Sequence, residues 1–171
     1  MKRSVHSETA LEHLINNSHK KELVPYLNKR RAYFAELLRL ALSDKPHYSW
    51  RAAWLLWSCV EKNDKRIRKQ VAKIIKTIPK RPDSQQRELI ILLEKMELSP
   101  ANEGRLYYIC SEIWKQPAKN PSLRSHAIKT MYRIAKHHPE LLEEVKALNT
   151  SPYTDNLSNT VKNNISKFVG T

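Results

Sequence analysis

Lysine and arginine side chains are concentrated in one segment of this sequence, and they are the groups best suited to bind a partner. Between Lys62 and Arg81 there are nine Lys and Arg residues and a single acid, Asp64. On a helical wheel most of these cations fall opposite a row of isoleucines, which predicts a ridge roughly 20 Å long at 1.5 Å per residue. We name this predicted set the basic ridge: Lys65, Arg66, Lys69, Lys73, Lys76 and Lys80.

Three kinds of anionic partner fit the basic ridge: the phosphates of nucleic acid, an acidic protein and an anionic membrane surface. The alternative interpretation is a solvated face whose lysines only keep the protein soluble. No aromatic residue is interleaved among these cations in the sequence. The segment by itself therefore lacks the stacking groups on which single-strand binding relies.

The sequence contains no pattern typical of a catalytic, metal or cofactor site. It has two glycines, no glycine-dependent nucleotide motif and no HExxH motif. The seven histidines lack the spacing of metal ligands, and we interpret the pair His137 and His138 as a helix cap. We expect no enzymatic activity and no cofactor.

The net charge of +14 is unevenly distributed along the chain. Residues 1–81 contain 19 Lys and Arg against 7 Asp and Glu, whereas residues 82–171 contain 12 against 10. This asymmetry concerns partners rather than fold, and it favours anionic partners. No apolar run reaches about 18 residues and no signal-peptide core is recognisable, so we expect a soluble, cytoplasmic protein without a membrane span. Cys59 and Cys110 are predicted to be reduced core residues.

The basic ridge requires a helix over residues 65–78, whose other side carries five β-branched residues for the core: Ile67, Val71, Ile74, Ile75 and Ile78. The preceding helix, over residues 49–62, is apolar on most of its circumference. We expect it to be the buried centre of the fold, with Trp50, Trp54 and Trp57 in the core. The alternative is that the three indoles form a platform for stacking a base or a ligand.

The predicted helices recur with a fixed period. Four prolines, each in a loop before a helix, are spaced by 36, 35 and 35 residues: Pro46, Pro82, Pro117 and Pro152. One series of helices is predicted to begin at Ser49, Ser84, Ser122 and about Thr154, and the other near Lys65, Glu103 and Pro139. This periodicity favours a solenoid of antiparallel helix pairs over a four-helix bundle with extra helices, because a bundle gives no reason for a sustained period.

Two of these helices carry an Arg followed by Ala and aliphatic residues, in Trp50-Arg51-Ala52-Ala53 and in Leu123-Arg124-Ser125-His126-Ala127-Ile128. This pattern resembles that of HEAT-like repeat proteins of the armadillo-type α-α superhelix, over about residues 20–170. The resemblance implies an all-α, right-handed α-α superhelix of three to four HEAT-like antiparallel helix pairs. It implies a single domain, residues 1–171, with capping helices in residues 1–19 and 154–171.

HEAT-like repeats mostly act as scaffolds for protein–protein interaction, and some bacterial members bind DNA as alkylation-repair glycosylases. The analogy with such an enzyme would require a carboxylate beside aromatic residues. Trp57 and Glu61 are one helical turn apart in the predicted helix, but such a pair is common by chance. The resemblance therefore implies a non-enzymatic scaffold with a protein or peptide partner. The alternative is a nucleic-acid-binding repeat protein that uses the basic ridge, and an enzyme is the third hypothesis. The sequence does not specify the oligomeric state.

Overall fold

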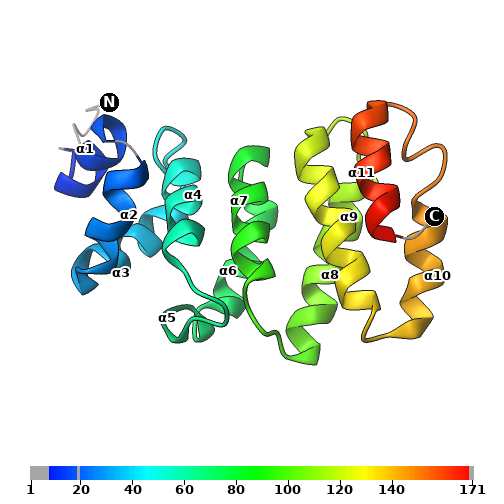
Figure 1. Cartoon of the computed structure of the whole chain (residues 1–171), viewed down its shortest axis with the longest axis horizontal. Coiled ribbons are helices and arrows are strands. Elements are labelled where there is room, and N and C mark those ends of the chain that lie inside the picture. The colour runs from blue at the N-terminus through cyan, green and yellow to red at the C-terminus, as the bar shows by residue number, and fades with distance from the viewer. Residues whose placement is uncertain (1–7, 19, 170–171) are drawn as a thin grey trace, which may run out of the picture.

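The computed structural model describes residues 8–18 and 20–169, and the regular structure in that part of the chain is entirely helical (Figure 1). The predicted all-α fold is confirmed. The described residues form eleven α-helices and one short 3₁₀-helix, η1. Their bounds are α1 (Ala10–Asn17), α2 (Lys20–Asn28), α3 (Arg31–Ala41), α4 (Ser49–Cys59), α5 (Lys65–Arg68), α6 (Val71–Thr77), η1 (Ile78–Lys80), α7 (Asp83–Glu94), α8 (Pro100–Trp114), α9 (Pro121–Ala135), α10 (Pro139–Leu148) and α11 (Asn159–Val169).

The helices form two layers along the length of the molecule (Figure 1). In the front layer, α4, α7, α9 and α11 stand side by side in chain order. The back layer contains α3, α6, α8 and α10, of which α3 packs against α4, α6 against α7, and α8 and α10 against α9. This arrangement is the predicted stack of helix pairs.

The helix starts follow the predicted period closely. In the front layer, α4, α7 and α9 begin within one residue of the expected positions. Helix α11 begins at Asn159 rather than near Thr154, because residues 151–156 form consecutive turns. Helices α8, α9 and α10 each begin with a proline, whose fixed φ suits the first helical position and whose missing N–H is not needed there.

The prediction that Trp50, Trp54 and Trp57 lie in the core is wrong for Trp50, and it is met only in part by Trp54 and Trp57, which pack against the core without being fully buried. Trp50 is 40% exposed, and the other two are half-buried. Helix α4 packs against α2, α3 and α7, and its buried positions are occupied by smaller residues: Ser49, Ala52, Ala53, Leu55, Leu56 and Cys59. Because α4 is apolar on most of its circumference, its periodicity could not show which side faces the core.

The predicted helix over residues 65–78 is interrupted between α5 and α6. The N–H of Gln70 donates to the carbonyl of Ile67 at 2.7 Å, and this three-residue bond tightens the chain between the two helices. The core positions are nevertheless buried as predicted, on both pieces: Ile67, Val71, Ile74, Ile75 and Ile78. The basic ridge therefore projects from several short elements, and the prediction of one straight helix is wrong.

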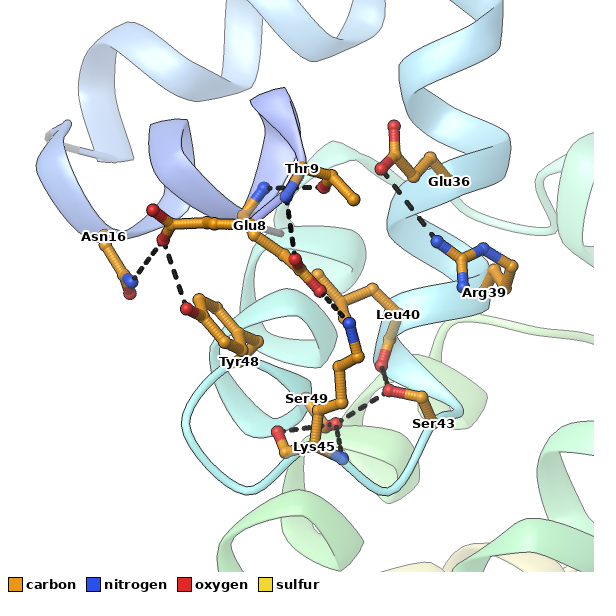
Figure 2. A network of polar contacts seen from close by, with 11 residues as sticks. Glu8, Thr9, Asn16, Glu36, Arg39, Leu40, Ser43, Lys45, Tyr48 and Ser49 are labelled. Atoms are coloured by element: carbon orange, nitrogen blue, oxygen red, sulfur yellow. Dashed lines mark hydrogen bonds and ion pairs between the residues drawn. The ribbon is translucent and has the colours of Figure 1, made fainter. Parts of the chain in front are cut away.

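Helix α1 is tied to the rest of the protein by a polar network, which includes Glu8, Thr9, Lys45 and Tyr48 in Figure 2. The Thr9 hydroxyl accepts the N–H of Glu12 at 3.2 Å, and the Glu12 carboxylate accepts the N–H of Thr9 at 2.9 Å, which forms a capping box. The same carboxylate, whose side chain is 3% exposed, accepts a hydrogen bond from Lys45 Nζ at 2.5 Å. The Tyr48 hydroxyl donates to Glu8 at 3.1 Å. Since Lys45 and Tyr48 precede α4, the network joins α1 to the loop after α3.

We expect this network to make stability depend on pH. Burial by itself would raise the pKa of Glu12, but hydrogen bonds from Lys45 and Thr9 outweigh it and hold the pKa below the ordinary 4.5. A carboxyl with a lowered pKa stabilises the folded state above the unfolded pKa and loses that contribution as pH falls through the folded value. Glu12→Gln should therefore cost about 1 to 3 kcal/mol of unfolding free energy near neutral pH.

The difference between wild type and Glu12→Gln should shrink once the pH falls below 4.5, the ordinary pKa of this carboxyl. Urea unfolding of both proteins across the acid range measures it, and Glu22→Gln on the exposed side of α2 is the matched control. A difference that stays constant down to the lowest pH at which the protein folds would contradict the assigned role of the ionised carboxylate.

Candidate functional site

The lysines of the basic ridge are all exposed: Lys65, Lys69, Lys73, Lys76 and Lys80. They lie on α5, on α6, on η1 and in the turn between α5 and α6. The structure therefore places the five ammonium groups on the surface, as required of a site for an anionic partner.

Arg66 differs from these lysines because its guanidinium makes several contacts with other residues of the protein. It lies 3.8 Å from the centroid of the Phe34 ring. Its Nη2 donates to Asp64 at 2.6 Å and to the carbonyl of Cys59 at 2.9 Å. The hydrogen bonds from Arg66 hold the pKa of Asp64 below its usual value. Arg66 thus fixes the turn between α4 and α5.

Tertiary packing places an aromatic residue beside the basic ridge. Helix α6 packs against α8, and a cavity of about 600 Å³, which we name the α6/α8 cavity, lies between them. Lys73 and Lys76 of α6 line it together with Arg105 and Tyr108 of α8. Tyr108 is 66% exposed. Sequence reasoning missed this neighbour, although Lys73 and Tyr108 are one repeat period apart.

A second cavity, of about 510 Å³, opens on the front layer, and we name it the front cavity. Each helix of the front layer contributes one apolar or aromatic side chain to its lining: Trp57 of α4, Ile91 of α7, Tyr132 of α9 and Phe168 of α11. The polar lining comes from α7, α9 and the residue after each: Glu94, Lys95, His126, Lys129, Thr130, Arg133 and Lys136. The cavity therefore combines an apolar floor with several cations.

Two cations of the front cavity cap helices. Lys95 Nζ donates to the carbonyls of Trp57 and Val60, at 2.6 and 2.8 Å, at the end of α4. Arg133 Nη1 donates to the carbonyl of Glu94 at 2.5 Å, at the end of α7. A cation at a helix C-terminus satisfies carbonyls that lack an intrahelical partner and interacts favourably with the helix dipole. The same contact thus recurs in successive repeats and fixes these two side chains.

The other two cations of the front cavity lie over aromatic rings. Lys129 Nζ is 4.6 Å from the centroid of Phe168, and Lys136 Nζ is 5.0 Å from that of Tyr132. Such contacts are favourable because the ring face is electron-rich. Phe168 remains 55% exposed. The lining of the front cavity therefore contains ammonium groups next to aromatic rings.

The carboxylates nearest the front cavity are engaged within the protein. Glu94 accepts a hydrogen bond from the Thr130 hydroxyl at 3.2 Å and lies 3.2 Å from His126 Nδ1. Glu88 accepts the indole N–H of Trp57 at 2.6 Å and pairs with Arg87. These acids therefore hold the lining in place.

Residues 7–169 match the HEAT repeat domain. The chain belongs to the HEAT repeat domain family. This match confirms the resemblance seen in the sequence, and HEAT repeats are in general non-enzymatic scaffolds that mediate protein interactions. Neither the curated proteins nor the solved structures give a match. Within residues 8–18 and 20–169, no helix is both long and apolar enough to cross a membrane.

The two residues of the glycosylase-like pair considered for this HEAT repeat protein do not share a helix. Helix α4 ends at Cys59, so Glu61 lies in the following segment, where it is exposed. The indole N–H of Trp57 instead donates to Glu88 of α7. The helical spacing of Trp57 and Glu61 therefore has no consequence in the fold.

The histidine pair of the HEAT repeat domain contacts a carboxylate. His138 occupies the N-cap position of α10, but its side chain makes no capping hydrogen bond there, so the predicted capping role of the side chain is wrong. His137 Nδ1 lies 3.3 Å and His138 Nε2 lies 3.2 Å from the carboxylate of Glu103, which comes from α8. Packing of α8 against α9 brings these groups together. In the part of the chain that the structure describes, no three His, Cys, Asp or Glu residues are grouped to hold a metal ion.

Proposed function

We propose that this HEAT repeat protein is a non-enzymatic scaffold that binds an acidic segment of a partner protein in the front cavity. The observation that carries the proposal is the lining: apolar side chains from four consecutive front-layer helices, with Lys129 and Lys136 beside two of the rings. The general role of HEAT repeats as interaction scaffolds supports it.

The size and floor of the front cavity suit an apolar anchor residue of the partner. Its volume of about 510 Å³ is comparable with that of pockets which enclose small ligands, about 300 to 1,000 Å³. Trp57, Ile91 and Phe168 provide apolar surface in it. Burial of an aromatic or aliphatic anchor in such a pocket commonly supplies most of the affinity of a protein interface.

The charge around the front cavity selects an acidic partner. Helices α9 and α11 contain no Asp or Glu, and Lys136 follows α9 directly. Glu88 and Glu94 are held by internal partners. Complementary potentials speed association and exclude partners of like charge. A segment with Asp or Glu on both sides of its anchor would therefore be favoured over a neutral or basic one.

The test uses a short fluorescein-labelled peptide with one central Phe flanked by Asp and Glu, and fluorescence anisotropy as the readout. We expect Phe168→Ala and the double variant Lys129→Gln/Lys136→Gln each to weaken binding by about tenfold, which corresponds to about 1.4 kcal/mol. Replacing the Phe of the peptide by Ala should have a similar effect.

Trp50→Ala is the matched control, because Trp50 is an exposed aromatic of the same front layer that does not line the front cavity. It should leave the affinity unchanged. Circular dichroism establishes that each variant is folded. If wild-type protein does not bind the peptide, or if Trp50→Ala weakens binding as much as Phe168→Ala does, the front cavity is not the site.

A further inference from the structure

We infer that the α6/α8 cavity binds single-stranded nucleic acid, with the Tyr108 ring stacked on a base and with Lys73, Lys76 and Arg105 at the phosphates. This site is separate from the front cavity, since it lies between two helices of the back layer. It takes a different ligand and does not depend on peptide binding in the front cavity.

Tyr108 has the exposure that a stacking residue needs. Its side chain is 66% exposed, although α8 has a buried side through which Leu106, Cys110 and Trp114 enter the core. Tyr108 and Ile109 line the α6/α8 cavity and also an adjoining hollow of about 240 Å³. Tyr108 therefore borders two hollows, of which the second is also lined by Glu112.

The cations of the site come from two walls. Lys73 and Lys76 project from α6 and Arg105 projects from α8, and none of the described residues that line the α6/α8 cavity is an acid. The basic ridge continues beyond it in both directions through exposed Lys69 and Lys80. A repeated row of cations beside a hollow matches a polymer that carries one charge per unit.

A single strand uses all these features together. Its phosphates meet the cations, and an unpaired base has a free face for Tyr108. A duplex keeps its bases stacked on one another, so it would use the lysines but not the ring. An acidic peptide would also use the lysines, but its carboxylates offer no flat partner to the ring. The exposed aromatic among cations therefore favours the single strand.

The test measures the binding of fluorescein-labelled oligo(dT) by anisotropy at several salt concentrations. Tyr108→Ala should weaken binding about tenfold, because it removes the base–aromatic stack. Tyr108→Phe should bind like wild type, because the ring is kept. Lys73→Gln/Lys76→Gln/Arg105→Gln should make the slope of log K against log salt shallower by about 2, at about 0.7 for each phosphate that is no longer neutralised.

Two variants control for general effects. Trp50→Ala removes an exposed aromatic elsewhere, and Lys21→Gln/Lys29→Gln/Lys167→Gln removes the same charge from other exposed positions. Trp50→Ala should bind oligo(dT) more tightly than Tyr108→Ala does. The triple variant at other positions should bind it more tightly than Lys73→Gln/Lys76→Gln/Arg105→Gln does. All substituted side chains are exposed, and circular dichroism confirms folding.

Three outcomes would overturn the inference. The first is equal binding of oligo(dT) by Tyr108→Ala and wild type, which would leave the ring without a role. The second is that duplex DNA of equal length binds as tightly as oligo(dT), with no response to Tyr108→Ala, which would indicate a site for phosphates alone. The third is that poly-glutamate competes as well as unlabelled oligo(dT) does, which would indicate a site for acidic protein.

Discussion

Replacing Trp114 by Ala is expected to lower the free energy of unfolding by about 3 to 5 kcal/mol. Trp114 is the last residue of α8 and is fully buried. Its indole N–H donates to the carbonyl of Leu148 at 2.7 Å, at the end of α10. The substitution removes the largest fully buried side chain among residues 8–18 and 20–169, and it leaves a cavity between repeats. It also leaves the Leu148 carbonyl without its donor, so the two penalties add.

Trp50→Ala is the matched control for Trp114→Ala, because it is the same substitution at an indole that is 40% exposed. It should cost less than about 1 kcal/mol, since little apolar surface leaves the core. Urea unfolding of both variants, followed by circular dichroism at 222 nm, gives the two values. Equal costs at the two positions would show that Trp114 is not the core residue described.

Replacing Arg124 by Ala is expected to cost about 3 kcal/mol, which is the second largest effect on stability. Arg124 is 1% exposed although it is a permanent cation. Its Nε donates to the carbonyl of Trp114 at 3.1 Å, its Nη2 donates to the carbonyl of Tyr153, and its guanidinium lies 4.8 Å from the Trp114 ring centroid. The variant leaves two carbonyls without their donor and uncovers one face of the indole.

Arg124→Lys tests whether stability requires the planar guanidinium with its two directed N–H donors, or only the positive charge. An ammonium cannot reproduce the pair of directed N–H bonds, so most of the loss should persist. Arg105→Ala is the matched control on α8, where the side chain is exposed, and it should change stability by less than about 0.5 kcal/mol. If Arg124→Lys unfolds at the same midpoint as wild type, the role given to the guanidinium group is refuted.

The coupling between the two residues can be measured separately. Because Trp114 and Arg124 are in contact, the double variant should cost less than the sum of the single ones, by about 0.5 to 3 kcal/mol. Strict additivity would mean that the two side chains stabilise the last repeats independently.

Helix positions and the repeat could be predicted because they depend on local physics. A proline fixes its own φ and lacks an N–H, so its effect is confined to about one turn, and α10 begins at Pro139 as expected. Isoleucines at helical spacing remain buried even where the helix over residues 65–78 is interrupted. The interruption itself was not predictable, because it follows from one tightened turn rather than from any break in the apolar pattern.

The sequence by itself determined a basic, all-helical chain with a repeat period, whereas the tertiary structure decided which side chains meet. The indoles of α4 were expected inside, but Trp50 is exposed and Trp54 and Trp57 are only half-buried, while alanines and leucines occupy the buried side of α4. The charges of residues 82–171 nearly balance in the sequence, but packing places α9 and α11, which contain no Asp or Glu, side by side. Tyr108 meets Lys73 only because α8 packs on α6. Contacts between repeats depend on how neighbouring helices are rotated about their axes, and no local pattern of residues encodes that rotation.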